Sequence, residues 1–163
     1  MAVQTLQDLF IETLKDLYYV EKTLVKSLPN MARKASSPDL QAAIESHIAE
    51  TEAQVGRIEQ IFELLGERAA AKKCEALEGL LKEADEVTQQ ITDRQTLDAA
   101  IIASAQTVEH YEIARYGTLA CWAAEIGQAE IAKLLEQTLD EERAADDKLS
   151  MLAENSVNQQ AVA

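Results

Sequence analysis

Apolar side chains recur every three or four residues along four long stretches of the chain, the spacing of an amphipathic α-helix. The first stretch runs from Leu6 to Leu28 and the second from Ile44 to Leu65. The third runs from Ile101 to Ala123 and the fourth from Ile131 to Leu152. The pattern therefore predicts four long helices, each with one apolar face.

Proline, serine and glycine mark the expected boundaries of these helices. Pro29 is expected to end or bend the first helix, because proline lacks a backbone donor and restricts the residue before it. Ser37 is expected to cap the second helix, with Pro38 at its first position. Gly66 and Gly127 are expected to end the second and third helices, since glycine readily adopts the left-handed backbone that closes a helix.

The segment 67–94 connects the second and third long helices and has helical spacing in its middle, which predicts a shorter amphipathic helix there. Two helix pairs joined by such a connection indicate an all-α fold, a ferritin-like four-helix bundle with an additional short helix in the long crossover. We expect one domain over residues 1–158 and a flexible tail over 159–163. The chain from Asn155 has little apolar surface to pack.

Composition supports one helical domain, because 47% of the 163 residues are apolar and only 5 are Gly and 2 are Pro. The net charge of -14 argues against nucleic acid or an anionic membrane as a partner. We expect no signal peptide and no membrane span, since no basic region precedes an apolar run and no apolar run is long enough. Cys74 and Cys121 lack metal-binding spacing, so reduced thiols in a cytoplasmic protein are expected.

Carboxylates lie where a bundle core should be apolar. Glu21, Glu109 and Glu142 each fall inside an apolar stripe, and Glu50 lies at the edge of the second one. A lone ionised carboxylate in a core costs several kcal/mol, so such groups rarely occur there without a partner. One carboxylate from each helix predicts a shared cation, and a pair of metal ions is the natural candidate.

The two halves of the chain repeat this arrangement at a nearly constant separation. Each half has a helix with an inward Glu, followed by a helix in which an acidic or amide side chain follows a Glu by four residues. The matching pairs are Glu21 with Glu112, Glu50 with Glu142, and Gln54 with Asp146.

The repeat predicts the role of each ligand. Oxygen-rich sites with few imidazoles suit iron, with manganese as an alternative, so we expect two Fe ions. The predicted bridging ligands are Glu50 and Glu142, the terminal ones are Glu21, Glu109 and Glu112, and Asp146 with Gln54 or His47 would complete the shell.

Other interpretations of these residues stay open. Glu21 could be a surface residue at the edge of its stripe, Glu50 a solvated one, and His47 a hydrogen-bonded core residue. His110 should project sideways, and Glu141 should be solvated because it points about a quarter turn away from Glu142. A further expectation concerns Tyr18 and Tyr116, whose hydroxyls should bond to carboxylates.

Five segments resemble the YciF-like family of bacterial ferritin-like stress-response proteins, and the resemblance spans residues 3 to about 158. The crossover segment makes it more specific than a general ferritin-like character. The segments are DLYYVEK (16–22), HIAETEAQ (47–54), KCEALEG (73–79), VEHYEIA (108–114) and LDEERAADDKL (139–149).

The resemblance implies a bundle with a crossover helix, a homodimer and a di-iron site. The wider ferritin-like pattern has Glu-x-x-His on the second and fourth helices. Here Ala53 and Ala145 stand three residues after Glu50 and Glu142, so the predicted site is poor in histidine.

Two hypotheses of function follow. In the first, the protein is a stress-associated di-metal protein with oxidase or peroxide-scavenging activity, and O2 or peroxide is its small-molecule substrate. In the second, it is a non-catalytic structural or interaction protein that retains an ancestral metal-site pattern. The sequence alone leaves both open.

Overall fold

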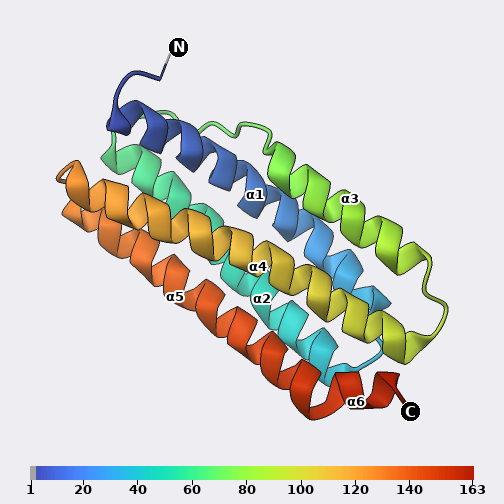
Figure 1. Ribbon diagram of the computed structural model, residues 1–163. Helices are drawn as coiled ribbons and strands as arrows, with labels where there is room; N and C mark the ends of the chain where they lie inside the picture. The colour runs from blue at the N-terminus through green and yellow to red at the C-terminus, as the bar shows by residue number, and fades with distance from the viewer. Residues whose placement is uncertain (1–2) are drawn as a thin grey trace.

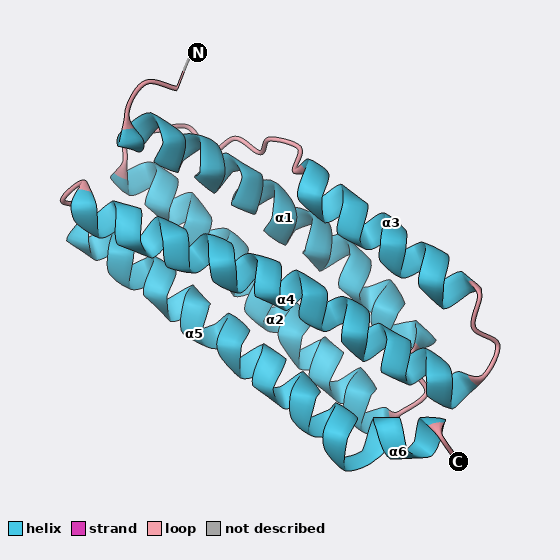
Figure 2. Ribbon diagram, viewed as in Figure 1, coloured by secondary structure: helices cyan, strands magenta, loops and turns pink. Residues whose placement is uncertain are grey.

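The structure, a computed structural model, describes residues 3–163, which form helices and loops and contain no strand (Figure 2). A short helix, α3, separates two pairs of long helices, and a π-helical turn at Ala153–Val157 leads into a last short helix, α6. The helices are α1 (Leu6–Lys34), α2 (Pro38–Leu64), α3 (Glu75–Gln89), α4 (Arg94–Glu125), α5 (Ala129–Leu152) and α6 (Asn158–Ala161).

The four long helices form a bundle in which each pair is antiparallel (Figure 1). Short turns join α1 to α2 and α4 to α5, whereas α3 carries the chain back along the bundle before α4 begins. The crossover is tied to α1 by a hydrogen bond from the Tyr19 hydroxyl to Glu78 (2.7 Å). This confirms the predicted all-α bundle with a crossover helix.

Local sequence signals set most of the helix boundaries. Ser37 caps α2 by accepting a hydrogen bond from the Leu40 amide (3.3 Å), with Pro38 as the first helical residue. Gly66 and Gly127 follow α2 and α4 with φ angles of 69° and 79°, a left-handed backbone that side chains with a Cβ rarely adopt. The predicted starts and stops of these helices are confirmed.

Pro29 does not end the first helix, because α1 continues through it to Lys34. Proline removes one backbone hydrogen bond from a helix interior. The flanking residues Leu28 and Ala32 are both buried in the core, and their packing holds the helix together across the proline.

The chain end also differs from expectation. Val157 is only 1% exposed, so the prediction that the chain from Asn155 has little to pack is wrong. The turn and α6 pack on α4. The boundary between a domain at 1–158 and a tail at 159–163 stays a prediction, and residues 1–2 of that domain lie outside the described residues.

The core is apolar toward both ends of the bundle and polar in its middle. Phe10, Phe62 and Leu135 are fully or almost fully buried toward one end, and Leu40 and Ile101 toward the other. The polar layer between them is the candidate site. Within residues 3–163 we find no helix that combines the length and apolar character needed to span a membrane.

Candidate metal centre

Each of the four long helices places at least one buried polar side chain in the middle of the bundle. Apart from buried threonines such as Thr51, these side chains belong to residues that the sequence analysis proposed as ligands. They are Glu21 (0% exposed), His47 (8%), Gln54 (0%), Glu109 (4%), Glu112 (1%) and Glu142 (0%).

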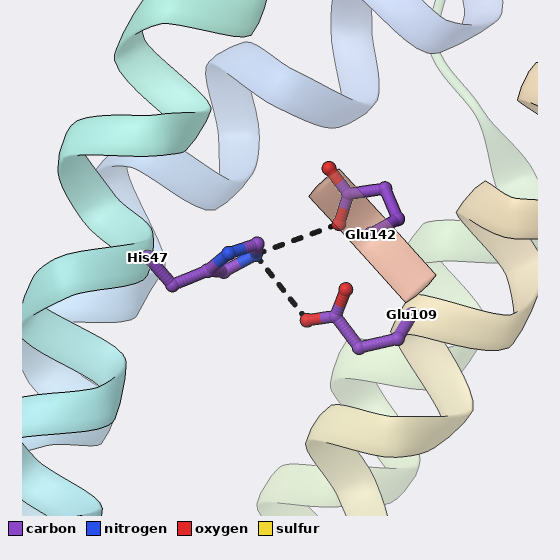
Figure 3. Close-up of side chains that lie close together, drawn as sticks. All are labelled: His47, Glu109 and Glu142. Atoms are coloured by element: carbon purple, nitrogen blue, oxygen red, sulfur yellow. Dashed lines mark ion pairs between the residues drawn. The ribbon is translucent and has the colours of Figure 1, made fainter. Parts of the chain in front are cut away.

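Five of these side chains, all except Gln54, form two groups that share one carboxylate. In the first, here called the pocket group, the His47 Nε2 atom lies 3.3 Å from Glu109 Oε1 and 3.8 Å from Glu142 Oε2 (Figure 3). The second, the inner group, consists of Glu21, Glu112 and Glu142. Within each group, one ligand atom from each residue lies within 4.8 Å of those from the other two. Glu142 thus lies between two places that could each hold an ion.

Several oxygens in this layer have no hydrogen-bond partner among the described residues. They are one carboxylate oxygen each of Glu21, Glu109 and Glu142, both oxygens of Glu112, and the amide oxygen of Gln54. Leaving a buried acceptor unsatisfied costs about 1–3 kcal/mol, and more when the group is charged. A bound cation would satisfy these oxygens together, so the donor set fits a metal pair.

The electrostatics of the layer agree with this geometry. Burial raises the pKa of Glu21, Glu109 and Glu112, because it disfavours the charged form of a carboxyl group. The neighbouring carboxylates raise each pKa further, with Glu142 acting on Glu21 and Glu109, and Glu21 acting on Glu112. Without a cation the layer therefore favours protonated carboxyl groups.

Two hydrogen bonds orient the buried carboxylates. The Tyr116 hydroxyl, on α4, donates to Glu21 on α1, and the Gln54 amide donates to Glu142. Burial, followed by the charge of Glu21, raises the pKa of Tyr116 far above its usual value, so this hydroxyl stays a donor. Tyr18 donates to Glu59 (2.6 Å), so both tyrosines bond to carboxylates as predicted.

A further brace connects α2 and α5 beside Glu142. Arg57 donates two hydrogen bonds of 2.9 Å to Glu141, and Gln54 also reaches Glu141, at 3.1 Å. Burial raises the pKa of Glu141, but the hydrogen bonds from Arg57 and Gln54 outweigh it and lower that pKa overall. Glu141 is therefore solvated only in part, since its side chain is 28% exposed and is also paired with Arg57.

Sequence reasoning missed Arg57 altogether. A signal was present, because Arg57 follows Gln54 by three residues and so lies on the same side of the helix. An arginine next to a stripe that also carries Gln54 is a natural partner for a nearby carboxylate.

Besides Gln54, two predicted ligands, both carboxylates, lie outside both groups. The Glu50 side chain is 46% exposed, and its carboxylate lies 3.3 Å from the Nδ1 atom of His47. Asp146 accepts hydrogen bonds from Gln106 (3.0 Å) and pairs with His110 (3.0 Å), whose side chain is 68% exposed as expected. Their roles as ligands stay predictions, and among the described residues Glu142 is the carboxylate common to both groups.

Comparison with known proteins agrees with these features. A family model described as a domain of unknown function (DUF892) matches residues 5–162. Protein YciF of Escherichia coli strain K12 is 46% identical over 162 residues, which cover 99% of this chain and 98% of YciF. The chain belongs to the YciF-like family.

Solved structures of YciF-like proteins have the same fold. The crystal structure of the E. coli stress protein YciF matches with a TM-score of 0.90 and 46% identity, over 96% of this chain and 99% of that one. YcfI of Rhodopseudomonas palustris, described as a structural protein, matches with a TM-score of 0.89 and 47% identity, over 91% and 94% of the two chains. The family predicted from the five motif segments is confirmed.

Proposed function

We propose that this YciF-like protein is a stress-associated metal-binding protein that holds two metal ions, iron or alternatively manganese, in the middle of its bundle. His47, Glu109 and Glu142 would hold one ion, and Glu21, Glu112 and Glu142 the other. The observation that carries the proposal is that buried Glu142 belongs to both groups and has an oxygen without a partner.

The chemistry of the donors favours these metals. Five of the six buried side chains offer oxygen and one offers nitrogen, which suits iron and manganese better than metals that prefer thiolate ligands. The unpartnered Gln54 amide oxygen adds a neutral donor beside Glu142. Glu50 is the ligand with the least support, because its side chain is about half exposed.

Iron held here would supply electrons for the reduction of O2 or a peroxide. The residues of this chain would prepare the site for it. Tyr116 orients Glu21, and the brace of Arg57, Glu141 and Gln54 orients Glu142. The apolar layers on either side limit water around the carboxylates, which strengthens their attraction for a cation. E. coli YciF is described as a stress protein, which supports a role under stress.

Metal binding can be tested by titrating chelator-treated protein with Mn(II), and with Fe(II) under anaerobic conditions. We expect two ions per chain by elemental analysis, and a melting temperature that rises by several degrees because the ions bind only the folded state. Glu142→Ala should abolish both effects, whereas Glu136→Ala, an exposed residue on the same helix, should not. Binding of only trace metal by the unmodified protein would sink the proposal.

A second function is favoured by the R. palustris relative, which is described as a structural protein. In this alternative the bundle is a structural or interaction module, and its carboxyl groups stay protonated and bonded to each other or to Tyr116. The same melting-temperature measurements distinguish the two functions, because a melting temperature that metals leave unchanged favours the structural function.

The proposal includes a homodimer, which follows from the family. It also includes a cytoplasmic location, which follows from the expectation of reduced thiols. Cys74 and Cys121 are both free in the structure. Analytical ultracentrifugation of the metal-free and metal-loaded protein would give the oligomeric state. A monomer at micromolar concentration would contradict the homodimer.

A further inference from the structure

A cavity of about 210 Å³ lies between α2 and α5 and reaches the pocket group. Two polar residues of its lining, His47 and Glu109, are more than nine-tenths buried, and each has an atom facing the other (Figure 3). Ser46, Glu50, Ala144 and Lys148 also line it and are exposed, so they mark its opening to solvent. Its buried apolar lining consists of Leu28, Ala43, Ile44, Ala105 and Leu149.

Small residues on α5 keep this cavity open. Ala144 and Ala145 both line it, and Ala145 stands three residues after Glu142, where the wider ferritin-like pattern has a histidine. An imidazole at this position would occupy part of the space. The absence of that imidazole therefore leaves an apolar space that leads to the centre.

We propose that this cavity binds the apolar part of an organic hydroperoxide, with its peroxide group beside His47 and Glu109. The proposal rests on the proposed function and names its substrate class. An apolar cavity of about 150 Å³ in another protein holds benzene, so this one has room for a small alkyl or aryl group. Hydrogen peroxide has no apolar part, so apolar walls would not contribute to its binding.

The polar end of the cavity suits the peroxide group. His47 and Glu109 both line the cavity and are 8% and 4% exposed, and His47 Nε2 lies 3.3 Å from Glu109 Oε1, so a hydrogen-bond donor and an acceptor stand together at this end. A hydroperoxide has a single polar end and can place it there while its carbon atoms contact Ile44 and Leu149.

The reaction balances with the iron of the proposed function. The O–O bond of the hydroperoxide breaks with the uptake of two electrons from two bound Fe(II) ions, which become Fe(III). Two protons from solvent complete the products, one alcohol and one water molecule.

Binding is tested first without metal, using cumyl alcohol, the unreactive product of cumene hydroperoxide. We expect saturable shifts of the methyl NMR signals of Ile44 and Leu149. Ala145→Leu should weaken this binding at least tenfold, and Ala144→Leu, at a more exposed position, serves as a second variant should the first fail to fold. Ala53→Leu is the matched control, because Ala53 is exposed on α2 and does not line the cavity. An absence of saturable binding, or binding that neither filling variant weakens, would overturn the proposal.

The second measurement compares substrates in Fe(II)-loaded protein by single-turnover oxidation. We expect cumene hydroperoxide to react faster than hydrogen peroxide, and Ala145→Leu to lower the ratio of the two rates at least tenfold while Ala53→Leu keeps it. Equal ratios in all three proteins would refute the substrate class.

The two proposals fail in different ways. Protein that binds cumyl alcohol but no iron refutes the proposed function, and the hydroperoxide reaction with it. Protein that binds iron but no alcohol refutes the cavity proposal alone. If the same methyl signals shift with protein concentration instead, a second copy of the chain covers the cavity, and the proposal is wrong.

Discussion

The inner group and the pocket group share Glu142 but differ in composition and access. The inner group contains only carboxylates, and none of its residues is more than 1% exposed. The pocket group contains an imidazole, lies beside a cavity and contacts the half-exposed Glu50 through His47. One end of the centre is thus built to hold charge away from water, and the other to meet molecules from solvent. The inner group therefore provides affinity for the ions, and the pocket group provides access for molecules from solvent.

The largest difference between the groups should come from Glu112→Gln. This change keeps the shape of the side chain and removes a carboxylate that has no hydrogen-bond partner among residues 3–163. We expect the stoichiometry to fall from two ions to one, and the metal-free protein to become about 1–3 kcal/mol more stable at pH 8, since an unpaired buried acid is costly. Metal titration and denaturant melts measure both effects. Loss of both ions would mean that the groups do not act separately.

The pH dependence of stability should reveal the same cost of burying carboxyl groups. The pKa values of Glu21, Glu109 and Glu112 are raised in the folded state above the ordinary value of 4.5. Above pH 4.5 the folded protein therefore binds more protons than the unfolded chain, so the metal-free protein should lose stability as the pH rises. Denaturant melts at pH 5 and pH 8 should differ by about 1 kcal/mol or more, since one pKa unit corresponds to about 1.4 kcal/mol.

General charge repulsion also grows with pH in a chain of net charge -14. Glu112→Gln isolates the contribution of the buried carboxyl groups to the pH dependence of stability, because it removes one titrating group from the layer. The free energy of unfolding should change less steeply with pH in this variant than in the unmodified protein. An identical pH dependence in both proteins would show that surface charge repulsion, and not the buried carboxyl groups, causes the loss of stability.

His47→Gln should produce a smaller change, limited to the pocket group. One ion should bind at least tenfold more weakly, a loss of about 1.4 kcal/mol, while the inner ion keeps its affinity. Calorimetric titration with Mn(II) resolves the two binding steps. Equal weakening of both steps would show that the imidazole serves the whole centre.

Glu50→Gln should have the smallest effect. The side chain is 46% exposed, and its contact is with His47 rather than with the inner carboxylates. We expect a change in metal affinity of less than threefold, in keeping with the small contribution of exposed ion pairs. A loss as large as that of Glu142→Ala would instead support the bridging role that the sequence repeat predicted.

The internal repeat illustrates how far sequence reasoning reached. It paired Glu21 with Glu112, and both lie in the inner group. It also paired Glu50 with Glu142, yet one is half exposed and the other fully buried. Both follow the same local pattern, but α2 is rotated so that His47, Thr51 and Gln54 face the core while Glu50 lies at the edge. The apolar pattern already placed Glu50 at the edge of its stripe, and this rotation of about a quarter turn outweighs the repeat, because it separates a core ligand from a surface one.

By itself the sequence determined the helices, most of their ends, the crossover and the family, because helix periodicity and caps depend on residues close together in the chain. It also showed that acids lie inside apolar stripes. Only the tertiary structure decided which acids meet at Glu142, that Arg57 pairs with Glu141, and that a cavity opens beside Ala145. Those features depend on how far apart separate helices lie and how they are rotated, and packing across the whole bundle sets both.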